Sequence, residues 1–129
     1  MTIDDLKNVR RQRLRVITLQ ERIDCLRSRA DYTQRQLGEY GASDPMRDRL
    51  AEYVAELDEL ERELTGEVIT LERAVMVVDH ALTMLPRNQE IVLRLRYCEG
   101  LSWRRVAKHA GYGERNCYKI HARYLKSVH

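Results

Sequence analysis

The sequence has no long apolar run, and this absence excludes a membrane-spanning protein. None of its 129 residues lies in a stretch that approaches the ~20 uninterrupted apolar residues of a membrane-spanning helix. The start of the chain, Met1 to Asp5, also lacks the basic beginning and apolar core of a secretory signal. We therefore expect a soluble protein in the cytoplasm, with no membrane partner.

Cysteine is scarce, and the pattern of Cys25, Cys98 and Cys117 excludes a disulfide framework because the three are odd in number and widely scattered. Cys117 and His121 are four residues apart, but two ligands do not make a metal site, so we expect no bound metal. The chain also lacks a glycine-rich phosphate loop, and no nucleophile has a plausible base and orienting group. We expect neither a cofactor nor enzyme activity.

What the chain does contain is typical of long helices. Ala, Glu, Lys, Leu and Arg supply nearly half of the 129 residues. The apolar content of 43% is too high and too regularly spaced for a disordered chain. We therefore predict an all-α protein.

Two apolar stripes with a 3-4 spacing run along the first 85 residues. Each predicts a long helix with a coiled-coil seam, which needs a partner helix to cover it. The first stripe comprises Val9, Gln12, Val16, Leu19, Ile23, Leu26, Ala30, Thr33, Leu37 and Tyr40. The second comprises Met46, Leu50, Tyr53, Leu57, Leu60, Leu64, Val68, Leu71, Val75, Val78, Leu82 and Leu85.

A short break separates the two stripes. Gly38 or Gly41 can end the first helix, Ser43 or Asp44 can cap the second, and Pro45 suits its first position. So short a connection predicts an antiparallel hairpin over residues 1–85, with arms at about 3–40 and 45–85. The charges of the arms are complementary, since the first carries Arg10, Arg11, Arg13 and Arg15 and the second carries Glu56, Asp58, Glu59, Glu61 and Glu63.

Charge is segregated along the chain although the net charge is only +3. Residues 1–37 carry nine basic and five acidic side chains, residues 38–86 carry four and twelve, and residues 87–129 carry ten and three. A basic C-terminal third beside an acidic middle indicates different partners for the two parts. Double-stranded DNA is the partner that best fits the basic third.

The C-terminal third, residues 86–129, has the pattern of a helix-turn-helix domain. Pro86 ends the long second helix, and Ser102 is a plausible cap for a short helix with Val106 and Ala107 inward. A turn at residues 111–113 then leads to a basic helix over about 114–127, with Cys117, Ile120 and Leu125 at core spacing. Such an outward-facing helix fits the major groove of DNA.

The residues that would contact DNA follow from their places on these helices. Candidates for reading base edges lie off the apolar face of the last helix, and they are Glu114, Arg115, Asn116, Tyr118 and Lys119. Candidates for phosphate contact lie mostly on the preceding helix, and they are Ser102, Arg104, Arg105, Lys108 and, further along, Arg123.

Two stretches of this third resemble a known DNA-binding module. Both stretches resemble region 4 of sigma-70-type factors. They are Leu-Arg-Leu-Arg-Tyr-Cys-Glu-Gly-Leu-Ser-Trp-Arg-Arg-Val-Ala at 93–107 and Glu-Arg-Asn-Cys-Tyr-Lys-Ile-His-Ala-Arg-Tyr-Leu at 114–125. The whole arrangement is similar to small phage and prophage transcriptional regulators, including late-gene activators and families of unknown function. The resemblance implies a base-reading role for Glu114, Arg115 and Lys119, a phosphate-contacting cap at Ser102, and contact with RNA polymerase.

This chain departs from the family pattern at three positions. Arg105 stands where an acidic residue is usual, Gly113 where Ser or Thr often caps the recognition helix, and Tyr118 where a basic residue is commoner. The base preference of known promoter elements therefore does not carry over.

The sequence leaves three functions open. The preferred hypothesis is a phage-type DNA-binding transcriptional regulator whose hairpin forms a homodimer or recruits another protein. A small terminase-like subunit for DNA packaging also combines a helix-turn-helix with helical oligomerisation segments. The third is an interaction module that docks on RNA polymerase without binding DNA.

Overall fold

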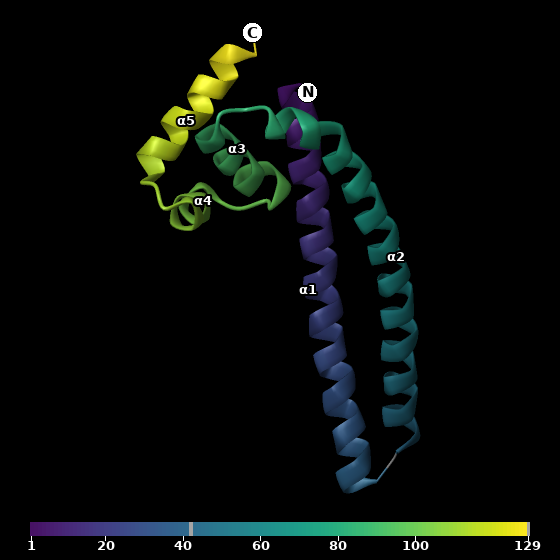
Figure 1. Cartoon of the computed structure of the whole chain (residues 1–129). Helices are drawn as coiled ribbons and strands as arrows, with labels where there is room; N and C mark the ends of the chain where they lie inside the picture. Colours follow the sequence, from purple (N-terminus) through teal and green to yellow (C-terminus); the bar gives the residue numbers. More distant parts are fainter. Residues whose placement is uncertain (42, 129) are drawn as a thin grey trace. The chain divides into compact units, whose positions relative to one another are not determined.

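The computed structural model describes residues 1–41 and 43–128, in which all regular structure is helical. The elements, in chain order, are α1 (Ile3–Tyr40), α2 (Asp44–Thr83), α3 (Arg87–Leu93), the π-helix η1 (Arg94–Cys98), α4 (Trp103–Ala110) and α5 (Glu114–Ser127) (Figure 1). The predicted all-α class is therefore confirmed, with two long antiparallel helices followed by short C-terminal ones. No helix in the described part of the chain is both long and apolar enough to cross a membrane.

The chain folds as two compact units. One comprises Val16–Val68, and the other combines Met1–Arg15 with the chain from Ile69 onward. The first turns of α1 therefore belong to the same unit as the C-terminal helices, although they are distant in sequence. No pattern in the sequence predicts this association of the first turns of α1 with the C-terminal helices.

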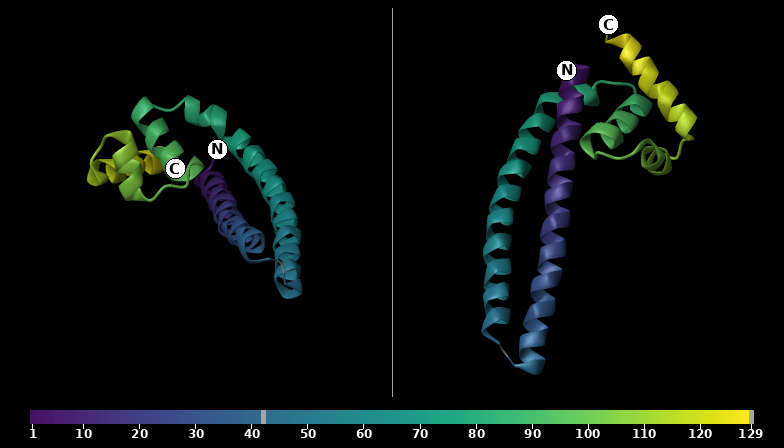
Figure 2. Two further views of the ribbon diagram at one scale, coloured as in Figure 1. Left: turned by 90° about the horizontal axis from the view of Figure 1, so that it is seen from below. Right: turned by 180° about the vertical axis from the view of Figure 1, so that it is seen from behind.

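In the unit Val16–Val68, α1 and α2 lie side by side and run in opposite directions (Figure 2). Their apolar stripes meet in a core of Leu19, Ile23, Leu26 and Leu60, flanked by Tyr53, Leu57 and Leu64. Arg27 pairs with Glu61 across the two helices at 2.8 Å. Both side chains are about half exposed, so the pair favours the antiparallel orientation more than it adds stability.

The turn between α1 and α2 follows the sequence signals. Gly41 has a φ of +80°, a conformation that ends a helix and that favours glycine. The carbonyl of Ser43 accepts a hydrogen bond from the Arg47 N–H at 3.1 Å, and Pro45 lies in the first turn of α2. The predicted break is therefore present where its residues are described.

In the other unit, the start of α1 is fixed by a reciprocal cap. The Thr2 hydroxyl accepts from the Asp5 N–H at 3.2 Å, and an Asp5 carboxylate oxygen accepts from the Thr2 N–H at 2.8 Å. This capping box satisfies N–H groups that a helix start leaves unpaired. The adjacent Leu6 and Val9 are fully buried, so this short segment is anchored in the unit.

Arg94 ties the end of α2 to η1 and α3. Its guanidinium donates to Asp79 at 2.8 Å, to the Thr83 hydroxyl at 3.1 Å and to Glu90 at 3.0 Å. One partly buried cation thus connects three successive elements around the break at Pro86. Charge-assisted bonds of this kind are the stronger class of protein hydrogen bonds.

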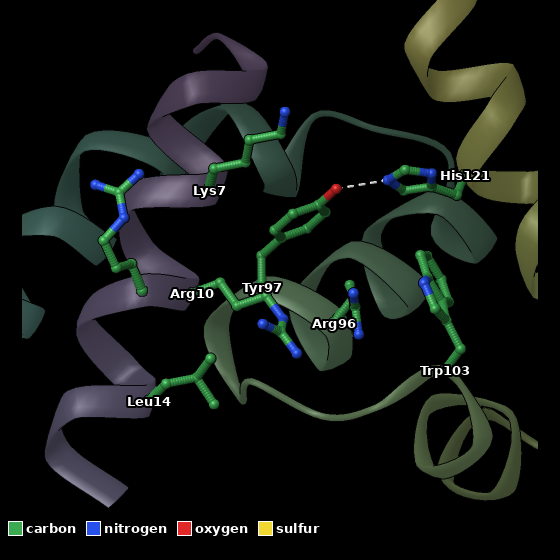
Figure 3. Close-up of a pocket in the computed structure, with 8 residues that line it drawn as sticks. Lys7, Arg10, Leu14, Arg96, Tyr97, Trp103 and His121 are labelled. Atoms are coloured by element: carbon green, nitrogen blue, oxygen red, sulfur yellow. Dashed lines mark hydrogen bonds between the residues drawn. The ribbon is translucent and has the colours of Figure 1, made fainter. Parts of the chain in front are cut away.

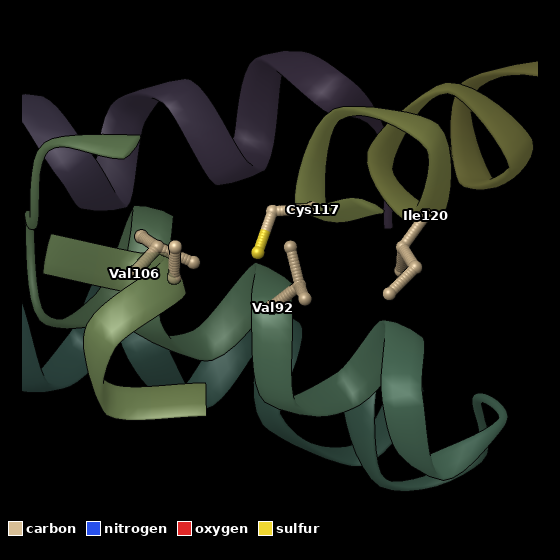
Figure 4. Packing of buried hydrophobic residues seen from close by; sticks show 5 residues of the cluster. Val92, Val106, Cys117 and Ile120 are labelled. Carbon is tan, nitrogen blue, oxygen red and sulfur yellow. The ribbon is translucent and has the colours of Figure 1, made fainter. Parts of the chain in front are cut away.

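The C-terminal helices share a compact apolar core (Figure 4). Its buried members are Val92, Val106, Ala107, Cys117 and Ile120, with Leu95, Leu101, Trp103 and Tyr112 packed against them. The prediction that Leu125 completes this core is wrong, because Leu125 is only partly buried. Tyr124 is fully buried instead, since a spacing of three and four residues aligns it with Cys117 and Ile120 on one helical face.

Candidate nucleic-acid interface

Helix α4 has a defined beginning and end, which position the turn before α5. The Ser102 hydroxyl accepts from the Arg105 N–H at 3.4 Å, as the predicted cap requires. Gly111 ends α4 with a φ of +75°, and its N–H donates to the Ala107 carbonyl at 3.0 Å. A residue with a Cβ is strained in this conformation, so glycine at 111 determines how α5 leaves α4.

Helix α5 begins without a side-chain cap. Gly113 occupies the N-cap position in an extended conformation, and no side chain accepts from the first turn. The acidic Glu114 lies in that turn, where the helix dipole favours negative charge. The first N–H groups of α5 are thus left to solvent or to an anionic ligand.

The predicted base-reading residues are all exposed on α5. Arg115 and Lys119 are four residues apart, and they lie off the face that buries Cys117 and Ile120. Tyr118 is 49% exposed, and its ring lies 5.0 Å from that of Trp103. Trp103 thus packs against α5 and holds the Tyr118 ring at one flank of the exposed face.

The predicted phosphate-contacting residues are exposed as well. Arg104, Arg105 and Lys108 lie on α4 away from the buried Val106 and Ala107. Within residues 1–41 and 43–128, no carboxylate pairs with them or with the exposed cations of α5 (Arg115, Lys119, Arg123 and Lys126). The two helices therefore present a surface of uncompensated positive charge.

Cys117 and His121 have different surroundings. Cys117 is fully buried in the apolar core, where burial raises the pKa of its thiol. His121 is half-buried and hydrogen-bonds the Tyr97 hydroxyl at 2.6 Å through Nε2. Among the described residues, no group of three or more His, Cys, Asp or Glu side chains is placed to hold a metal.

A second group of cations, which sequence reasoning missed as a site, lies where α1 meets the C-terminal helices. Lys7, Arg10, Arg11 and Leu14 of α1 line a pocket together with Arg96, Tyr97, Trp103 and His121 (Figure 3). From the sequence, the basic run of α1 is predicted to complement the charge of the acidic second arm. Instead, the Arg13 Nε–H donates to the Cys98 carbonyl at 2.7 Å and so holds α1 against the end of η1.

The π-helix η1 supplies two residues of this pocket. In it the Glu99 N–H donates to the Arg94 carbonyl at 2.9 Å, a five-residue step that widens the turn. Such wide turns are frequent at functional sites. Arg96 and Tyr97 lie inside this turn. No pattern in the sequence predicts a π-helix at these residues.

Comparison with known proteins assigns the chain to one family. Residues 18–128 match the family described as "Protein of unknown function (DUF722)", and the chain belongs to that family. The comparison with curated proteins found no match. The comparison with solved structures found none either.

Proposed function

We propose that this member of the DUF722 family is a sequence-specific DNA-binding transcriptional regulator of the phage type. In this proposal α4 and α5 act as a helix-turn-helix, and α5 enters the major groove. Glu114, Arg115, Asn116, Tyr118 and Lys119 contact base edges. Ser102, Arg104, Arg105, Lys108 and Arg123 contact phosphates.

The observation that carries the proposal is the uncompensated positive surface of α4 and α5 over a packed core. A rigid support matters because a recognition helix must keep its side chains in register with base edges. The buried Cys117 and Ile120 fix α5 against α4, while Arg115 and Lys119 stay exposed. Exposed cations without carboxylate partners are free to replace the counterions of a phosphate backbone.

A homodimer through α2 is the second part of the proposal. A shallow groove on α2 is lined by Arg47, Leu50, Ala51, Val54, Ala55 and Asp58. The order of these residues is self-complementary: an antiparallel second copy places Arg47 against Asp58, Leu50 against Ala55 and Ala51 against Val54. A twofold contact requires this kind of match between a surface and itself.

The first experiment measures binding to random duplex DNA over a salt series. The parent should lose affinity steeply, with a slope of roughly 0.9 per neutralised phosphate. The double variant Arg115→Ala/Lys119→Ala should bind more weakly with a shallower slope. Arg29→Ala/Arg35→Ala removes the same charge from exposed positions of α1 and should match the parent.

The two contrary results have different meanings. Equal loss in both double variants would show that binding follows net charge and not the α5 surface. Absence of DNA binding by the parent at low salt would contradict the proposal and direct the search to RNA polymerase as a docking partner. A closed ring of many subunits would instead favour the packaging function.

A further inference from the structure

The pocket between α1 and the C-terminal helices is open to solvent, has a volume of about 460 Å³ and lies within one compact unit. Four of its eight lining residues are cations, namely Lys7, Arg10, Arg11 and Arg96. None of the eight is acidic. Aromatic rings of Tyr97, Trp103 and His121 form much of the remaining wall (Figure 3). This composition favours an anionic ligand.

The positive charge of the pocket is not balanced by the described part of the protein. No carboxylate there pairs with any of the four cations. Burial lowers the pKa of the Arg96 guanidinium, and the nearby charge of Arg10 lowers it further. Two arginines held close without a counterion are an unfavourable arrangement that an anion between them would relieve.

Arg10 supplies the most specific signal. Its Nε is buried and has no hydrogen-bond partner among the described residues. Because this buried donor is unpaired, the protein itself compensates the charge of Arg10 poorly, and an anion that contacts the guanidinium where Arg10 lines the pocket would compensate it. The Arg10 side chain extends from α1 toward η1, where Arg96 lies (Figure 3).

Arg96 is held in place on the other side of the pocket. Its guanidinium donates to the Leu101 carbonyl at 3.0 Å and lies 4.7 Å from the centre of the Trp103 ring. The Tyr97–His121 hydrogen bond at 2.6 Å fixes a third wall between η1 and α5. Burial and the charge of Arg96 lower the pKa of His121, which favours the neutral ring as a polar wall of the pocket.

We propose that this pocket binds a phosphate group, with Arg10 and Arg96 as its principal ligands and Lys7 and Arg11 at its rim. Arginine suits phosphate because its planar donors match the tetrahedral oxygens in pairs. The phosphate belongs either to the backbone of a bound DNA duplex or to a free phosphorylated small molecule. If the phosphate is that of a DNA backbone, this inference rests on the proposed function. If it is that of a free small molecule, the inference is independent of the proposed function.

The only tryptophan of the chain makes the pocket directly observable. Because Arg96 lies over the Trp103 ring, a phosphate bound to Arg96 should change the tryptophan fluorescence. We would titrate the full chain with inorganic phosphate and use sodium chloride at matched ionic strength as the reference. A saturable change with phosphate alone is the expected result.

Variants on α1 test the assignment of the ligands. Arg10→Gln should weaken phosphate binding by about tenfold or more, as the loss of a charge-assisted hydrogen bond implies. Lys7→Gln/Arg11→Gln changes two exposed residues and should weaken binding severalfold with the fold intact. Arg29→Gln removes one charge from the same helix outside the pocket lining and should bind like the parent.

Duplex DNA then distinguishes the two sources of the phosphate. If the site contacts DNA, Arg10→Gln reduces the salt slope of duplex binding by about 0.9 relative to Arg29→Gln. If the ligand is a free phosphate compound, Arg10→Gln and Arg29→Gln bind duplex equally, and only Arg10→Gln loses the phosphate response. Phosphate binding by a chain that binds no duplex would leave this inference standing while the proposed function fails.

Two results would overturn the inference. One is a fluorescence response of the parent that is the same for phosphate and for chloride. The other is equal phosphate binding by the parent, Lys7→Gln/Arg11→Gln and Arg29→Gln. If circular dichroism shows that Arg10→Gln is unfolded, phosphate binding by Lys7→Gln/Arg11→Gln is the test of the pocket.

Discussion

The backbone of Gly111 is the residue-scale feature on which the exit of α5 depends. Its φ of +75° disfavours any side chain, whereas the exposed Gly66 inside α2 has no heavy atom within 4 Å of an added Cβ. Gly111→Ala should therefore destabilise the protein by about 1 kcal/mol or more, and Gly66→Ala should stabilise it by about 0.5–1 kcal/mol. Urea unfolding of the two variants measures both changes in the free energy of unfolding, which should have opposite signs.

Equal effects of the two alanines would contradict this account of Gly111. Both changes add one methyl group at an exposed glycine, so they differ chiefly in backbone conformation. If only Gly111→Ala lowers the free energy of unfolding, we also expect this variant to bind DNA more weakly, because α5 would leave α4 at an altered angle.

His121 gives the protein a pH dependence with a definite sign. Burial and the charge of Arg96 lower its pKa in the folded state, so the unfolded chain binds more protons just below the ordinary histidine pKa of about 6.5. Its contribution to stability is therefore present above that pH and is lost as the pH falls toward the lowered folded value. We expect a lower urea midpoint near pH 5.5 than near pH 7.5.

The variant His121→Gln isolates this contribution from the other histidines. Its urea midpoint should change less over the same pH interval than that of the parent, because the titrating ring is absent. An equal pH dependence in both proteins would assign the effect to other groups.

At the scale of the element, the exposed face of α2 is the feature with a testable consequence. Val54 is 56% exposed in the groove proposed to join two copies, and Val77 is 63% exposed on the same helix outside that groove. Val54→Glu should weaken the homodimer by at least about tenfold, since a charge would be buried against a second copy. Analytical ultracentrifugation measures the dissociation constant, and Val77→Glu is the matched control.

A charge exchange tests the antiparallel register of that dimer. Arg47→Asp alone should weaken the contact because it faces Asp58 of the second copy. Arg47→Asp/Asp58→Arg should restore it, since both twofold-related pairs are again of opposite sign. A monomeric parent, or dissociation by Val77→Glu instead of Val54→Glu, would contradict the proposed interface.

Elements of this chain were predictable where local signals agree. The apolar stripes of 3-4 spacing predicted α1 and α2, and the turn residues around Gly41 and Pro45 predicted where one ends and the other begins. Ser102 likewise predicted the beginning of α4, and Gly111 predicted its end. In each case the determinant lies within a few residues of the element that it defines.

Features that depend on tertiary contact were not predictable in the same way. The basic run of α1 is equally compatible with an acidic partner helix and with the carbonyl of Cys98, which Arg13 contacts. The buried Arg10 Nε arises only when distant segments pack together, and the wide turn of η1 lies where Arg13 of α1 contacts the Cys98 carbonyl. The exposed residues Arg115 and Lys119 were foreseen because a helix places them opposite its own apolar face.

At the scale of the whole molecule, charge and symmetry together determine the expected DNA site. The ten basic and three acidic side chains of residues 87–129 contrast with the acidic majority of residues 38–86, so DNA should contact the C-terminal part. A homodimer carries two such parts, which predicts a footprint with two half-sites related by a twofold axis. Nuclease footprinting should show this for the parent and a single half-site for Val54→Glu.

The most direct test of the central claim is selection of bound sequences from a random duplex library. The parent should enrich one sequence, and Arg115→Ala should lose about 1–3 kcal/mol of discrimination at one base position. Lys108→Ala should weaken binding to all sequences alike, because a phosphate contact carries no sequence information. A parent that enriches no sequence, or an Arg115→Ala variant that enriches the same sequence equally well, would contradict the proposal that α5 reads DNA.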